Sequence, residues 1–148
     1  IPALKNAEFF RFGSVHRNTY MQSPKLLNND LSFQKNDRIF LAGQITGVEG
    51  YTESSAIGLL AGLAVSAKLN GKEFVMPPKE TMIGAPHDYA VNGGLHKYSP
   101  MNANLGLLPT IKKQKGLSKP ERKAMQCEQS RNVFEEYATR TKLRPLNA

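Results

Sequence analysis

Three glycines in one short stretch are the residues of this chain best suited to binding a ligand. Gly43, Gly47 and Gly50 permit turns with positive φ and bring backbone N–H groups close to a bound group. Gln44 stands beside the first glycine, and its side chain can both donate and accept hydrogen bonds. The pattern favours recognition of a cofactor by backbone and amide groups, with an ordinary turn at the end of a strand as the alternative.

The segments on both sides of these glycines predict the elements that position them. Residues 39–42 are apolar at every position, which is typical of a parallel strand covered on both faces, and we expect that strand over residues 38–42. Residues 54–67 are nearly all small or aliphatic, so the helix predicted over residues 52–69 should be buried on all sides. A strand, a glycine turn and a helix N-terminus in succession are how open α/β sheets bind cofactors.

Outside this region few strands are predicted. Residues 8–21 are rich in aromatic and β-branched types and favour a strand or a bent hairpin, interrupted near Gly13. A short helix is expected over residues 79–85, with a loop after it, and residues 101–109 are expected to be irregular. A buried strand with so few neighbours leaves a sheet edge that invites pairing with another chain.

The last helix has the clearest start signal in the chain. Ser118-x-x-Glu121 fits a capping box with Pro120 in the first turn, so the helix should begin at Ser118 and run to about residue 140. Its predicted apolar stripe consists of Met125, Phe134, Tyr137 and Ala138.

Positive charge is concentrated near the C-terminus. Residues 112–148 hold ten Lys or Arg and four Glu, so this segment carries +6 of the formal net charge of +8. Such a concentration favours an anionic partner, with RNA or DNA phosphate first, although a solvated basic helix accounts for it equally well. The candidate phosphate contacts are Lys112, Lys113, Lys115, Lys119, Arg122 and Lys123.

The cysteine and histidine content limits the chemistry. A single cysteine, Cys127, excludes an intramolecular disulfide and a zinc site built from several cysteines. His16, His87 and His96 share no metal-ligand spacing with it, so no metal site is predicted. The sequence contains no signal peptide or transmembrane run, which makes the cytoplasm the expected location.

Four blocks of sequence resemble one known family. They are His16-Arg-Asn-Thr-Tyr20, Ser23-Pro-Lys-Leu-Leu27, Gly43-Gln-Ile-Thr-Gly-Val-Glu-Gly-Tyr51 and Met101-Asn-Ala-Asn-Leu-Gly-Leu-Leu-Pro109. In this order they resemble the C-terminal third of the folate- and flavin-dependent tRNA (uracil-5-)-methyltransferases, TrmFO. The related MnmG (GidA) flavoproteins, which modify wobble uridine in tRNA, have a similar Gly-Gln-x-x-Gly turn followed by a small-residue helix, but the first and fourth blocks favour TrmFO.

The resemblance implies an activity and a fold. In that reaction a methylene group passes from methylenetetrahydrofolate through reduced FAD to C5 of a uridine in the tRNA T-loop, and NAD(P)H supplies the reducing equivalents. Some members of the family act on rRNA instead. The implied fold is α/β, with the C-terminal portion of a Rossmann-like FAD-binding domain over residues 1–111. The basic helical segment over residues 112–148 would belong to the same domain.

The resemblance also implies that the chain is a fragment. It opens at Ile1 without a Met and holds no Gly-x-Gly-x-x-Gly strand-turn-helix, so its expected partner is the missing N-terminal part of the protein. Alone it is expected to bind FAD weakly or not at all, to hold no catalytic residue and to transfer no methyl group. Self-association through the free sheet edge is a further hypothesis. The alternative to a flavoenzyme fragment is a non-catalytic basic RNA-binding or docking module.

Two sets of site residues follow from the resemblance. The expected flavin contacts are Gly43, Gln44, Gly47, Gly50, Tyr51, Thr52, Glu53 and Ser54. The expected folate or substrate contacts are His16, Arg17, Asn18, Tyr20, Asn102 and Asn104. Tyr51 would flank the isoalloxazine ring, with a buried structural tyrosine as the alternative, and the two later asparagines could instead brace their loop. Cys127 matches no cysteine of the family and is interpreted as structural or incidental.

Overall fold

The computed structural model describes residues 2–10, 13, 18–94, 98–110 and 117–143. Its elements in chain order are the 3-10 helices η1 (Pro2–Leu4) and η2 (Ser23–Lys25), strands β1 (Ser32–Phe33) and β2 (Asn36–Phe40), η3 (Gly43–Thr46), β3 (Val48–Glu49), α1 (Tyr51–Leu69), α2 (Gly84–Asn92), β4 (Met101–Asn102) and α3 (Lys119–Thr141). The described residues thus form a mixed α/β structure with two small sheets and three α-helices.

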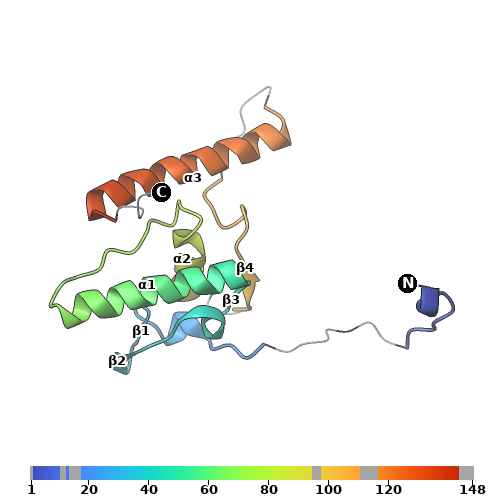
Figure 1. The fold of residues 1–148 in the computed structure, drawn as a ribbon, viewed down its shortest axis with the longest axis horizontal. Coiled ribbons are helices and arrows are strands. Elements are labelled where there is room, and N and C mark those ends of the chain that lie inside the picture. Colours follow the sequence, from blue (N-terminus) through green and yellow to red (C-terminus); the bar gives the residue numbers. More distant parts are fainter. Residues whose placement is uncertain (1, 11–12, 14–17, 95–97, 111–116, 144–148) are drawn as a thin grey trace.

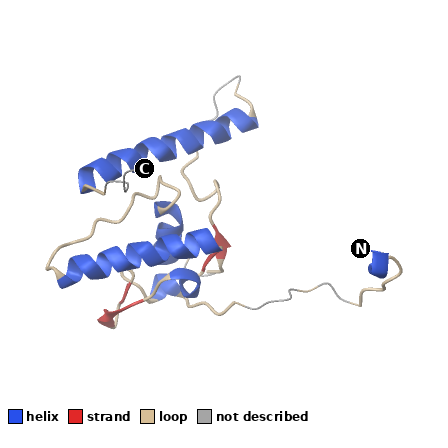
Figure 2. Cartoon of the chain, in the orientation of Figure 1, coloured by secondary structure: helices blue, strands red, loops and turns tan. Residues whose placement is uncertain are grey.

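In the view of Figure 1 and Figure 2, the connection that follows α1 runs between the two long helices, α1 and α3, and α1 passes in front of α2. Helix α3 contacts that connection through two hydrogen bonds. Met82 donates its backbone N–H to Ser130 Oγ at 3.0 Å, and the Tyr137 hydroxyl donates to the Val75 carbonyl at 2.7 Å. Gln126 Nε2 of α3 also donates to the carbonyls of Leu105 and Pro109, at 3.4 and 3.1 Å. Most residues of α3 are otherwise exposed.

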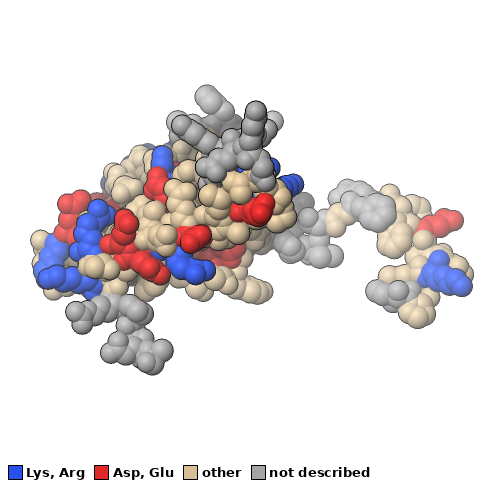
Figure 3. Space-filling model, turned by 90° about the horizontal axis from the view of Figure 1, so that it is seen from above, with Lys and Arg blue, Asp and Glu red and all other residues tan. Residues whose placement is uncertain are grey.

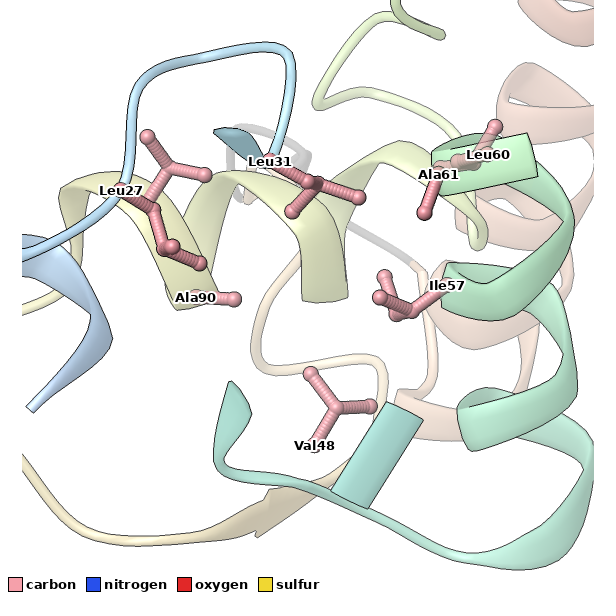
Figure 4. Packing of buried hydrophobic residues seen from close by; sticks show 8 residues of the cluster. Leu27, Leu31, Val48, Ile57, Leu60, Ala61 and Ala90 are labelled. Atoms are coloured by element: carbon pink, nitrogen blue, oxygen red, sulfur yellow. The ribbon is translucent and has the colours of Figure 1, made fainter. Parts of the chain in front are cut away.

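The hydrophobic core lies between α1, α2 and the loops around β1 and β3 (Figure 4). Helix α1 contributes Ile57, Leu60, Ala61 and Ala64, whose spacing places them on one face. The other buried apolar members of the cluster are Leu27, Leu31, Val48, Ala90 and Val91. The core therefore packs helix α1, which follows the glycine turn, against helix α2.

The prediction that α1 is buried on all sides is wrong for this chain. The helix itself is confirmed, but the face opposite Ile57 and Leu60 is open, and the side chain of Leu59 on it is 59% exposed. A β-carbon at Gly58 or Gly62 would meet no neighbouring atom within 4 Å. A small and aliphatic composition does not specify how many faces of a helix are covered, and the described residues cover only one face of α1.

The strand predicted over residues 38–42 also differs. Strand β2 pairs in antiparallel fashion with β1, Ser32 opposite Phe40 and Phe33 opposite Asn36, and Ile39 is 49% exposed. An apolar run does not specify its partner, and the segment just before it is close enough to form a hairpin. Among the described residues, the one parallel pair of strands is β3 with β4.

Two local predictions need correction. Residues 8–10, 13 and 18–21 form no strand, and the rest of the predicted hairpin lies outside the described residues. Helix α2 begins at Gly84 rather than near residue 79, because Pro86 is tolerated in a first helical turn and Thr81 Oγ1 accepts the N–H of Gly84 at 2.9 Å.

The C-terminal half follows the sequence more closely. Residues 101–109 are irregular except for the two residues of β4. Helix α3 is confirmed with its capping box: Ser118 Oγ accepts the Glu121 N–H, and a Glu121 carboxylate oxygen accepts the Ser118 N–H at 2.7 Å. The boundary expected at residues 111 and 112 lies outside the described residues.

Candidate functional site

The parallel pairing of β3 with β4 joins the glycine turn to the segment around residues 101–104. Val48 lies opposite Met101 and Glu49 opposite Asn102, and the Met101 N–H donates to the Gly47 carbonyl at 2.9 Å. Two blocks separated by about fifty residues of sequence thus form one edge, with the start of α1 directly behind it.

A third block reaches the same turn from the N-terminal side. Asn18 Nδ2 donates to Glu49 Oε1 at 2.9 Å, and the Met21 N–H donates to the Ile45 carbonyl at 2.9 Å. The ring of Tyr20 lies 6.4 Å from that of Tyr98, which itself stacks on Tyr89 at 5.2 Å. Asn18 and Tyr20 therefore lie beside the turn, as their assignment to a common site requires.

The glycine turn has the backbone conformation that the sequence predicts. Gly43, Gly47 and Gly50 adopt φ values of 70°, 84° and 96°. At Gly47 there is also a packing reason, since a β-carbon would lie 2.6 Å from Cε1 and 2.8 Å from Cζ of Tyr98. The turn is thus shaped by an aromatic ring that comes from residue 98, far away in the sequence.

Tyr98 holds the turn by its hydroxyl as well as by its ring. It is only 4% exposed, and its hydroxyl donates to the Thr46 carbonyl. Burial raises the pKa of Tyr98 well above its usual value of 10.0, and the neighbouring Tyr89 raises it further. The hydroxyl therefore stays protonated and remains a hydrogen-bond donor at neutral pH.

The start of α1 combines an exposed ring with engaged polar side chains. Tyr51 is 97% exposed, so the alternative of a buried structural tyrosine is wrong in this structure. Ser54 Oγ donates to the Val48 carbonyl at 3.1 Å, and Glu53 Oε1 accepts the Ala103 N–H at 3.2 Å. Because the Glu53 carboxylate already occupies the positive end of the helix, this end suits a neutral ring better than a phosphate.

A largely apolar cavity of about 430 Å³ opens beside this helix start. It is lined by Thr52, Glu53, Ala56, Ile57, Met82, Ile83, Pro86 and Ala103. The Glu53 carboxylate is the one charged group among these lining residues. A cavity of this composition suits a flat organic ring system with a few polar atoms.

The remaining predicted contacts are less closely gathered. Gln44 is exposed on η3 and Asn102 on β4. The Asn104 side chain bridges its own loop, donating to the Asn102 carbonyl and accepting the Gly106 N–H, both at 2.9 Å, as in the loop-bracing alternative. His16 and Arg17 lie outside the described residues.

Of the six predicted phosphate contacts, three lie outside the described residues and three lie in α3. Lys112, Lys113 and Lys115 lie outside the described residues. Lys119, Arg122 and Lys123 lie in the first turns of α3, where Glu121 is the one acidic neighbour and is engaged in the capping box. Farther along the helix acidic and basic residues are interspersed, and Figure 3 shows both signs on the same face.

Sequence reasoning missed two residues of this site. Glu49 binds Asn18, and Tyr98 shapes Gly47 and binds Thr46. The position of Glu49 between Val48 and Gly50 could have drawn attention to it, whereas nothing local to residue 98 indicates its role. In the described ranges, no three His, Cys, Asp or Glu side chains gather closely enough to hold a metal ion, and no helix is long and apolar enough to cross a membrane.

The chain was compared with protein families and with individual known proteins. Residues 1–73 match the family described as glucose inhibited division protein A. Over most of its length, the chain is homologous to the proteins named methylenetetrahydrofolate–tRNA-(uracil-5-)-methyltransferase TrmFO. The four-block resemblance to TrmFO is thereby confirmed.

Three relatives show the extent of the match. The TrmFO of Natranaerobius thermophilus is 44% identical over 140 residues, which is 95% of this chain and 32% of that protein. That of Hydrogenobaculum sp. is 52% identical over 125 residues, covering 82% and 27%. That of Nitratidesulfovibrio vulgaris strain Hildenborough is 41% identical over 146 residues, covering 99% and 30%. The chain thus spans about a third of the length of these relatives.

Proposed function

We propose that this chain is part of an RNA uridine C5-methyltransferase that takes its methyl carbon from methylenetetrahydrofolate and uses FAD and NAD(P)H. One observation carries the proposal: the blocks around residues 18, 47 and 101 meet at a single glycine turn. Their convergence agrees with a common site, and relatives 41–52% identical to the chain bear the name of this activity. The activity is proposed for a protein of the relatives' length that contains the chain.

The residues at the turn fit a flavin. Gly47 and Gly50, both with positive φ, turn the backbone on the two sides of β3, and Tyr51 presents a fully accessible ring at the start of α1. In this proposal Gly43 and Gln44 contact the ribityl chain or pyrophosphate, and the first turn of α1, with Thr52, Glu53 and Ser54, lies at the pyrimidine edge. FAD bound there would supply the redox chemistry that converts the methylene group into a methyl group.

The chain's own residues would orient the reactants. Tyr51 would cover one face of the flavin ring and keep water from it. Asn18 and Tyr20, held beside the turn, would contact the folate or the uridine, and the amide of Asn102 lies on the same edge. His16, Arg17 and Asn104 are proposed for the same role on the resemblance alone.

We also propose that the RNA, a tRNA or an rRNA, binds along the basic segment at the start of α3. Lys119, Arg122 and Lys123 support this, since Glu121, the acidic residue of the first helical turn, is held by Ser118. In the same proposal residues 1–111 belong to a Rossmann-like FAD-binding domain, and the protein acts in the cytoplasm. The match of residues 1–73 to the glucose inhibited division protein A family supports a wobble-uridine modification flavoprotein as the second candidate.

Flavin binding tests the proposal. A hybrid protein is made by replacing the matched 140 residues of the Natranaerobius thermophilus relative with this chain. We expect the purified hybrid to be yellow and to bind FAD, while the 148-residue chain alone quenches added FAD weakly or not at all. A hybrid that folds but retains no flavin would contradict the flavoenzyme proposal. Retention of tRNA by the chain alone, without flavin in the hybrid, would favour a non-catalytic docking module.

A further inference from the structure

The contact between Asn18 and Glu49 determines which atom of the Asn18 amide is free. A carboxylate at neutral pH only accepts hydrogen bonds, so the amide must turn its NH2 group toward Glu49. The 2.9 Å bond from Asn18 Nδ2 to Glu49 Oε1 has this arrangement. Within the described part of the chain, no hydrogen bond engages Asn18 Oδ1.

The position of Glu49 makes the arrangement rigid. It lies in β3, between Val48, which is completely buried, and Gly50, and it pairs with Asn102 of β4. Its backbone is therefore fixed by the sheet and by the start of α1, while Asn18 belongs to a segment without regular structure. Glu49 positions Asn18, rather than the reverse.

We infer that Glu49 is a positioning residue that holds Asn18 as a hydrogen-bond acceptor and thereby selects a heterocycle with a ring N–H beside a carbonyl. This inference rests on the proposed function. Flavin, pterin and uracil all carry that group, so the shared chemistry is an imide or amide N–H donated to Asn18 Oδ1. A ring presenting only an acceptor at this position would leave two acceptors facing each other, unpaired.

The test reverses the polarity of the pair. Glu49→Lys supplies a donor, so Asn18 must turn its carbonyl toward the introduced ammonium group and its NH2 toward the ligand. The tether between the two segments remains, but the group offered to the ligand changes from acceptor to donor. Adding Asn18→Asp to that variant restores an acceptor, because one carboxylate oxygen pairs with the ammonium group and the other faces the ligand. Glu73→Lys, at an exposed position away from the turn, is the matched charge-reversal control.

The variants are measured in the hybrid protein, with three constants for each: the Kd of FAD, the KM of methylenetetrahydrofolate and the KM of the RNA. We expect Glu49→Lys to weaken one of them by roughly 10- to 100-fold, the range for a mismatched buried hydrogen bond. The double variant should recover most of that loss, and Glu73→Lys should change none. The constant that responds identifies the ring as flavin, pterin or uracil.

Two results would overturn the inference. In the first, Glu49→Lys leaves all three constants unchanged, as a mere tether predicts; in the second, the double variant shows the same loss as the single one. If Glu49→Lys does not fold, Asn18→Asp alone replaces it. Two adjacent carboxylates disfavour ionisation, so ligand binding by that variant should weaken at about pH 8 and recover near pH 5.5, where the pair shares a proton. The absence of this pH dependence would also overturn the inference.

A direct measurement separates this inference from the proposed function. In the 148-residue chain with 15N-labelled asparagine, the side-chain NH2 signals of Asn18 should shift when Glu49 is changed to Gln and stay in place when Glu73 is changed to Gln. Unchanged Asn18 signals in the first variant would refute the pairing. An inactive parent hybrid would instead refute the proposed function, whatever the outcome at Asn18.

Discussion

Gly47→Ala tests whether Tyr98 shapes the glycine turn, and Gly71→Ala provides the matched control. Both glycines have positive φ, 84° at Gly47 and 63° at Gly71. They differ in their surroundings: a β-carbon at position 47 would overlap the Tyr98 ring, whereas at position 71 it meets nothing within 4 Å. The two substitutions therefore share the backbone strain, and only the first adds overpacking.

Backbone strain and overpacking each lower the free energy of unfolding by an amount that can be estimated separately. An alanine in the left-handed region costs about 1–2 kcal/mol, which is the whole expected loss for Gly71→Ala. Overpacking against a buried ring adds about 1–3 kcal/mol, so Gly47→Ala should lose about 2–5 kcal/mol in the free energy of unfolding. For a chain of this size each kcal/mol lowers Tm by roughly 2–4 °C.

Urea unfolding of both variants, followed by circular dichroism, measures the difference. We expect Gly47→Ala to be the less stable of the two by about 1–3 kcal/mol. Adding Tyr98→Leu to Gly47→Ala makes room for the new methyl group, so the two changes should be less than additive. Equal losses for Gly47→Ala and Gly71→Ala would refute the claim that Tyr98 restricts position 47.

Three further changes test individual contacts of the structure. Tyr98→Phe leaves the Thr46 carbonyl unpaired and should lower the unfolding free energy by about 1–3 kcal/mol. Because burial raises the pKa of Tyr98 above 10.0, the parent protein should also lose stability as the pH rises past 10.0. The Phe variant should lose less stability over the same pH range. Ser118→Ala removes the cap of α3 and should cost about 1 kcal/mol, seen as reduced helix content in circular dichroism, with Ser99→Ala as a control in a loop. Burial lowers the pKa of His87 below 6.5, so its contribution to stability is present above 6.5 and lost as the pH falls below it. The non-titrating variant His87→Gln can still donate to the Asn29 carbonyl and should show a flatter urea midpoint between about pH 7 and 5, whereas equal slopes would contradict the buried neutral histidine.

The elements that the sequence predicted well are those with local signals. The start of helix α3 was predicted to within one residue, because Ser118, its N-cap, and Glu121 form the capping box within one turn. Helix α1 ends at Leu69, as Asn70 and Gly71 indicate. The positive φ angles at Gly43, Gly47 and Gly50 were likewise predictable, since only glycine adopts them without strain.

The misses involve partners that are distant in sequence. The apolar residues 39–42 gave no information on whether β2 would pair with a parallel strand or with β1. The exposed face of α1 has the small and apolar residues of a covered helix, and its composition alone could not reveal how much of it the chain covers.

The same limit applies to the candidate site. The resemblance brought Asn18, Gly47 and Asn102 together as members of one family's motifs, but their meeting depends on the pairing of β3 with β4 and on the side chains of Glu49 and Tyr98. Those contacts join residues roughly thirty to fifty positions apart. No periodicity or spacing in a single sequence encodes them.

Transfer of labelled carbon to RNA tests the central claim most directly. The hybrid with the Natranaerobius thermophilus relative is incubated with methylenetetrahydrofolate labelled in its methylene carbon, FAD, NADPH and an unmodified tRNA transcript, and the nucleosides are then separated. The account predicts label in 5-methyluridine from the T-loop. A hybrid that holds FAD but leaves the T-loop uridine unlabelled, or labels the wobble uridine instead, would contradict it.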